Sequence, residues 1–166
     1  MTAPLLVFGW GNPSRGDDAL GPLFVGQLKG LVAPEAAARV DFLEEYQLQI
    51  EHALDLAGRS AVLFVDASLD CAIPFQTTRL SAARDASFTT HALSPQSVMQ
   101  VYRDLNHEEP PPCTLLAIRG SRFALGERPD RRALSHLAQA LIWGRRWLAG
   151  SGRPDPAPAD GQHDHA

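Results

Sequence analysis

The order of apolar and polar positions predicts strands and helices that alternate along the chain. Short apolar runs predict buried strands at residues 5–8, 40–43, 60–66 and 114–118. Apolar residues at helical spacing predict helices at residues 20–31, 46–57, 94–105 and 130–149. The unbroken run before Asp66 indicates a central strand that is buried on both faces, as in a parallel sheet.

One further strand, Phe75 to Leu80, has a different pattern, because its polar and apolar residues alternate. Only about eight residues separate it from Asp66, whereas a parallel return needs a dozen or more. We therefore expect an antiparallel edge strand here. The predicted fold class is α/β: a three-layer αβα domain with a mostly parallel twisted sheet of about five strands and helices on both faces. This domain is expected over residues 1–150, and the Pro-, Gly-, Asp- and His-rich residues 151–166 are expected to form a disordered tail.

Composition narrows the classes of partner. The chain has 166 residues, 45% of them hydrophobic, and a net charge of -4, which gives no basic surface for nucleic acid or an anionic membrane. Its two cysteines form no C-x-x-C motif, so a cysteine zinc cluster is not expected. The first apolar run lacks a preceding basic segment and is too short to cross a bilayer. The expected location is the cytoplasm.

The most informative stretch is the glycine-rich turn Gly9-Trp10-Gly11-Asn12-Pro13, which is followed by the acids Asp17 and Asp18. A dinucleotide-binding loop would need its third glycine where Ser14 stands, and two carboxylates would repel a pyrophosphate. Two acids at the end of this loop favour binding of a cation or proton transfer over binding of a dinucleotide. Asp17 is expected to shape the loop rather than to bind a ligand.

Asp18, Asp66 and His91 are the candidate site residues. Each follows or ends a predicted element at the carboxyl edge of the sheet, where such folds bind ligands. Two carboxylates and one imidazole leave open positions on a divalent transition metal, and Ni, Zn, Mn or Fe(II) would be reasonable. The spacing of these residues alone leaves a structural alternative open. In it, Asp18 caps the first helix and the His91 side chain forms hydrogen bonds with backbone groups.

Four motifs occur in a distinctive order: Gly9-x-Gly11-Asn12, Gly16-Asp17-Asp18-x-x-Gly21, Val65-Asp66-Ala67 and Thr90-His91-x-Leu93-Ser94-Pro95. Together they resemble the hydrogenase maturation proteases, endopeptidases that trim the carboxyl terminus of the large subunit of [NiFe]-hydrogenases. The resemblance covers the chain to about Ala149. The stretch Gln47-x-Gln49-x-Glu51-His52 departs from the family's more usual Asp-Gly-Gly-Thr element and resembles the branch that serves cytoplasmic NAD-reducing hydrogenases.

The resemblance implies roles for the three candidate residues. Asp18, Asp66 and His91 would contact nickel already installed in the large-subunit precursor, or another divalent metal at the same site. The family carries Glu or Asp at the position of Asp18. The implied function is removal of the precursor's C-terminal extension after nickel insertion, and the implied partner is that precursor. A protein that senses nickel and escorts the precursor without cleaving it is the alternative.

The catalytic nucleophile is left open. Cys71 and Cys113 have no histidine partner in sequence and are expected to pack in the core, while a carboxylate dyad of Asp18 and Asp66 is conceivable. Trp10, Asn12 and Gln47 are candidates to bind the substrate peptide. For Trp10 burial under the loop is an equal alternative, and for Gln47 a solvated helix start.

Overall fold

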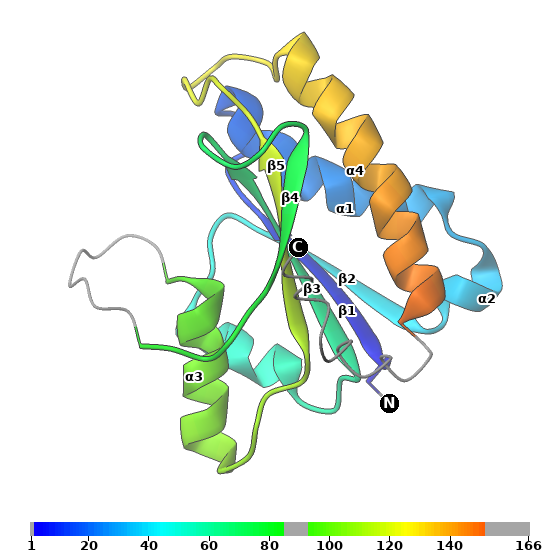
Figure 1. Cartoon of the computed structure of the whole chain (residues 1–166), viewed down its shortest axis with the longest axis vertical. Coiled ribbons are helices and arrows are strands. Elements are labelled where there is room, and N and C mark those ends of the chain that lie inside the picture. Colours follow the sequence, from blue (N-terminus) through cyan, green and yellow to red (C-terminus); the bar gives the residue numbers. More distant parts are fainter. Residues whose placement is uncertain (1, 85–92, 152–166) are drawn as a thin grey trace, which may run out of the picture.

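The computed structural model describes residues 2–84 and 93–151 of the chain. Within these residues, five strands form one sheet in the order β2-β1-β3-β5-β4 (Figure 1). The parallel strands are β1 (Leu5–Trp10), β2 (Val40–Glu45), β3 (Ala61–Ser68) and β5 (Cys113–Arg119). Strand β4 (Phe75–Arg79) pairs antiparallel with β5 at the edge, which confirms the prediction for this segment.

Helices cover both faces of the sheet, as predicted. Helices α1 (Leu20–Leu31) and α4 (Arg131–Gly150) pack on one face. Helix α3 (Pro95–Asn106) and the 3-10 helix η2 (Ile50–Leu56) pack on the other. Figure 1 shows α1 and α4 together on one side of the sheet and α3 on the opposite side. A short helix, α2 (Pro34–Ala37), leads into β2 and was not predicted from the sequence.

The apolar runs are explained by burial on both faces. In β1, Leu5 and Val7 belong to the core beneath α1 and α4, whereas Leu6 and Phe8 belong to the core beneath α3 and η2. Successive strand residues point to opposite faces, so a strand covered on both sides needs apolar residues throughout. The same alternation holds in β3, which confirms its predicted place inside the sheet.

The helix predicted at residues 46–57 is wrong in length and type. Residues 46–49 are not helical, Gln49 is extended (φ -131°, ψ 162°), and only Ile50–Leu56 form the 3-10 helix η2. The apolar spacing was nevertheless informative, because Leu48, Ala53 and Leu56 are all buried. Because Leu48 is anchored in the core, residues 46 and 47 run across the protein surface between β2 and η2.

Helix α4 begins one residue after Asp130, whose carboxylate accepts the backbone N–H of Arg132. Leu134 in the first turn of α4 is exposed. The buried residues of α4 follow the 3.6-residue period of a helix: Ala133, Leu137, Ala140, Leu141 and Gly144. Residues 152–166, the predicted tail, lie outside the described residues, so its disorder stays a prediction.

The strand order creates a reversal point beside β1. From β1 the chain moves to β2 on one side, and then returns to add β3 and β5 on the other. The crevice outside the carboxyl ends of β1 and β3 is therefore where an open α/β sheet binds ligands. Among the described residues, no helix is both long and apolar enough to cross a membrane.

Candidate active site

A hollow of about 400 Å³ lies at this reversal point. We call it the acidic hollow, and it is lined by Trp10, Gly11, Asn12, Arg15, Asp18, Tyr46, Gln47 and Asp66. Five of these residues were named from sequence as candidates: Trp10, Asn12, Asp18, Gln47 and Asp66. His91 lies outside the described residues, so its position relative to the hollow stays a prediction.

Asp18 reaches the hollow from the 3-10 helix η1 (Gly16–Ala19), which follows the glycine-rich turn. Its Oδ2 accepts the backbone N–H of Asn12 at 2.8 Å. Helix α1 has Ala19 as its N-cap and no side-chain cap, so Asp18 does not cap that helix. Gly11 has a φ of 145°, and a Cβ there would overlap the carbonyl oxygen of Asp18. The turn can therefore fold back over Asp18 only with glycine at this position.

Asp66 enters the hollow from β3, two residues before that strand ends. Burial, and then the negative charge of Asp18, raise the pKa of Asp66 from its ordinary 3.8 to about 7, against a smaller lowering by the backbone N–H of Ala67. A carboxyl group with this pKa can take up or release a proton near neutral pH. A cation bound between the two acids would replace that proton.

Asp17 serves a different purpose from its neighbour, as expected. Its side chain is fully buried. Its Oδ2 accepts the backbone N–H groups of Ser121 at 2.7 Å and Arg122 at 3.0 Å, and its Oδ1 accepts that of Asp130 at 2.7 Å. These bonds tie the site loop to the segment between β5 and α4. Because both oxygens are engaged, Asp17 is a structural acid.

The predicted substrate-binding residues are placed as follows. Trp10 is half-buried, with its ring edge-on to Phe8 and Phe64, so it both packs and lines the hollow. Asn12 uses its side-chain oxygen to accept the backbone N–H of Ser14 at 2.9 Å, which closes the turn. Gln47 is exposed at the rim.

Sequence reasoning missed Tyr46 and Arg15 as residues of the hollow. Tyr46 was assigned to a helix, whereas the structure leaves it 68% exposed on the segment after β2. Arg15 donates from Nε to the carbonyl oxygen of Phe123 at 3.2 Å, a contact across 108 residues. Each residue directly precedes a motif named above, Arg15 before Gly16 and Tyr46 before Gln47. Only the strand order, with β2 beside β1, shows that these two parts of the chain meet.

The two cysteines behave as packing residues. Both are buried, and both thiols lie near backbone carbonyl oxygens, of Ala117 for Cys71 and of Pro111 for Cys113. Burial raises the pKa of the Cys113 thiol to about 12, so it is not a thiolate at neutral pH. Within residues 2–84 and 93–151, no group of three His, Cys, Asp or Glu side chains is arranged to hold a metal ion. The acidic hollow supplies two carboxylates of the three predicted ligands.

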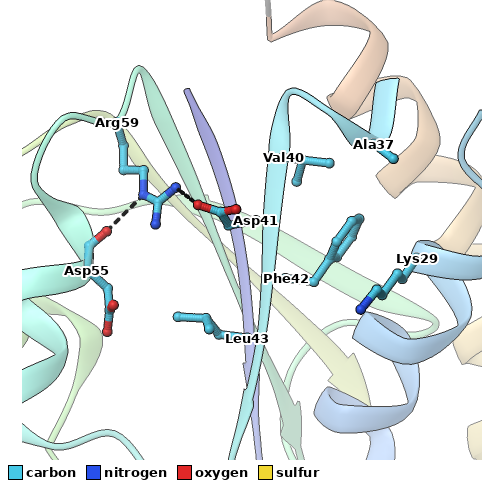
Figure 2. A pocket seen from close by; sticks show the side chains of 8 residues that line it. All are labelled: Lys29, Ala37, Val40, Asp41, Phe42, Leu43, Asp55 and Arg59. Carbon is cyan, nitrogen blue, oxygen red and sulfur yellow. Dashed lines mark hydrogen bonds and ion pairs between the residues drawn. The ribbon is translucent and has the colours of Figure 1, made fainter. Parts of the chain in front are cut away.

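A second hollow, of about 460 Å³, lies along the edge strand β2 and holds none of the predicted site residues (Figure 2). Arg59 dominates its polar side, with a side chain only 6% exposed and ion-paired with Asp41. Arg59 also donates from Nε to the Asp55 carbonyl oxygen at 2.9 Å and from Nη1 to that of Ala3 at 2.8 Å. These bonds join the end of η2 to β2 and to the chain start, which is a structural role.

Several solved structures that are similar to this chain are hydrogenase maturation proteases. HybD, the hydrogenase maturating endopeptidase from E. coli, has 23% identity and a TM-score of 0.69, with 89% of this chain and 93% of that chain covered. HycI, a [NiFe] hydrogenase maturation protease from Thermococcus kodakarensis KOD1, has 21% identity and a TM-score of 0.67 over the same shares. The hydrogenase 2 maturation peptidase from Thaumarchaeota archaeon SCGC_AB-539-E09 has 19% identity and a TM-score of 0.62, covering 87% and 97%.

Neither a protein-family model nor a curated protein sequence matches the chain. The likeness is therefore one of three-dimensional structure, and it extends over nearly the whole length of the solved proteins. The chain has the αβα fold of the hydrogenase maturation proteases.

Proposed function

We propose that this protein is an endopeptidase that removes the C-terminal extension of a [NiFe]-hydrogenase large-subunit precursor after nickel insertion. The observation that carries the proposal is the meeting of Asp18 and Asp66 in one hollow at the reversal point of this fold. The motifs around both residues and the solved structures of the same fold support the same function.

Nickel is part of the substrate in this proposal. A precursor that carries nickel would present it to the acidic hollow, where Asp18, Asp66 and His91 would occupy its open coordination positions; another divalent metal could use the same donors. A precursor without nickel lacks that bridge and is held less tightly. The protease thereby selects loaded precursor through a difference in binding free energy. A metal that also polarises the scissile carbonyl or a water would assist cleavage as a Lewis acid.

Mass measurement separates cleavage from escort. Purified protein is incubated with nickel-loaded precursor and, separately, with nickel-free precursor. We expect a fall in the mass of the loaded large subunit only, with its extension released as a peptide. A stable complex with unchanged subunit mass would instead identify a nickel-sensing escort, and cleavage of both precursors alike would refute nickel recognition.

Replacing Asp18, Asp66 or His91 with alanine is expected to lower the rate of precursor processing by about 100-fold or more, since each change removes a proposed metal contact. Circular dichroism should show that Asp18→Ala and Asp66→Ala remain folded. Asp70→Ala is the matched control, because Asp70 is an exposed acid just beyond β3 and outside the acidic hollow. Processing at the parent's rate by any one alanine variant would remove that residue from the site.

A further inference from the structure

The segment of Tyr46, Gln47 and Leu48 forms one side of the acidic hollow through its first two residues, and Leu48 anchors it in the core. Tyr46 and Gln47 face the hollow and solvent, and Leu48 is the one buried side chain of the three. We call these three residues the Tyr46–Leu48 wall. Apart from this anchor, the position of the wall depends on how its two flanking residues, Glu45 and Gln49, are held.

His52 contacts both flanking residues. Its Nδ1 accepts the backbone N–H of Gln49 at 2.8 Å, and its Nε2 lies 3.8 Å from Oε1 of Glu45. Because a backbone N–H can only donate, Nδ1 must be free of a proton, and the neutral ring then carries its proton on Nε2, toward the Glu45 carboxylate. The backbone carbonyl oxygen of Glu45 in turn accepts the backbone N–H of Gly11, a residue that also lines the hollow, at 3.0 Å.

The ring of His52 cannot turn freely. Its side chain is 12% exposed, and the ring stands edge-on to Phe8 with centroids 4.7 Å apart. Phe8 also contacts the ring of Trp10, which lines the acidic hollow. At the far end of η2, Arg59 holds the carbonyl oxygen of Asp55 (Figure 2). Helix η2 is thus a fixed base from which His52 can hold the wall.

We propose that His52 is a positioning residue that fixes the Tyr46–Leu48 wall for binding of the substrate chain. The inference rests on the proposed function. His52 is not among the residues that line the acidic hollow, so it acts through Glu45 and Gln49 and does not touch the reacting groups. Loss of its hold should loosen the wall and weaken binding of the precursor, while Asp18 and Asp66 keep their places.

Two substitutions separate the acceptor atom from the ring. His52→Phe keeps a ring beside Phe8 but removes the acceptor for the Gln49 N–H. His52→Asn removes the ring but offers Oδ1 near the place of Nδ1. We expect His52→Phe to raise KM for nickel-loaded precursor about tenfold with kcat within about twofold of the parent, and His52→Asn to recover most of the loss. Glu51→Gln, at an exposed neighbour in η2, is the matched control and should match the parent.

An unchanged KM in His52→Phe, equal damage in both variants, or a fall in kcat alone would overturn the proposal. NMR of the parent tests it without any variant: the Gln49 amide should be protected from hydrogen exchange and Nδ1 of His52 unprotonated. Rapid exchange of that amide, or a proton on Nδ1, would also overturn it.

If the parent fails to cleave the precursor, the proposed function is refuted, and the role of His52 is then decided by NMR. Tyr46 and Gln47 amide signals that shift in His52→Phe but not in His52→Asn would support it, and unchanged signals would refute it.

Discussion

Replacing Asp17 with alanine is expected to lower the free energy of unfolding by about 3 to 5 kcal/mol. The buried carboxylate accepts three backbone N–H groups, from Ser121, Arg122 and Asp130, at 2.7 to 3.0 Å. Alanine removes every acceptor and leaves the three donors without the fully buried carboxylate that they share. Urea unfolding followed by circular dichroism measures the loss.

The adjacent acid provides the matched comparison. Asp18 is half-buried, and its side chain accepts one backbone N–H, from Asn12. We therefore expect Asp18→Ala to cost about 1 kcal/mol of stability and to abolish processing. Asp17→Asn keeps one acceptor oxygen and should fall between the parent and Asp17→Ala. If Asp17→Ala unfolds within about 1 kcal/mol of the parent, the carboxylate does not hold the loop as described.

The layered fold could be predicted from sequence because its determinants are local. The run Leu5 to Phe8 needs apolar residues at every position to serve both faces of the sheet, and such a run is visible without coordinates. Serine before proline is typical of a helix start, and in α3 the Ser94 hydroxyl accepts the Ser97 N–H while Pro95 is the first helical residue. The antiparallel direction of β4, and with it the edge position, followed from the connection after Asp66, which is too short for a parallel return.

The details that escaped prediction depend on partners far along the chain. The carboxylate of Asp17 meets N–H groups more than 100 residues away, and no local pattern announces them. The segment after β2 has helical apolar spacing, but its Leu48 enters the core from an extended path, so only η2 is helical. Periodicity records which side chains are buried, and several backbone paths can bury the same set.

The candidate site falls between these two cases. Asp18 and Asp66 could be brought together from sequence because parallel strands end at one edge and ligands bind at the reversal point of the strand order. That rule predicts the edge of the sheet at which the site lies, but not the other residues that line the hollow. Tyr46 lines the hollow because it follows β2, and Arg15 lines it while bonded to Phe123 in the loop before α4. The positions of β2 and of that loop follow from tertiary packing.

Replacing Asp66 with asparagine is expected to stabilise the protein at pH 8 by about 2 to 4 kcal/mol while precursor processing is lost. In the folded protein the pKa of Asp66 is raised to about 7, mainly by burial and further by Asp18, whereas the unfolded chain has the ordinary 3.8. Between these values the folded state holds a proton that the unfolded state has released. The stability that this proton contributes is fully present below pH 3.8 and is lost as the pH rises through 7.

Asparagine never ionises, so it avoids the cost of an anion buried beside Asp18. The difference in unfolding free energy between Asp66→Asn and the parent should therefore be near zero at pH 4, grow through neutral pH and level off above pH 8. Urea unfolding at each pH, in the presence of a chelator, measures it; groups that titrate in both proteins cancel in the difference. Asp70→Asn, at an exposed acid, should show no such growth. A difference that is flat with pH would contradict the raised pKa. A difference that grows while processing disappears would show that this acid is kept at a cost to stability, as expected for a carboxylate that awaits a cation brought by its substrate.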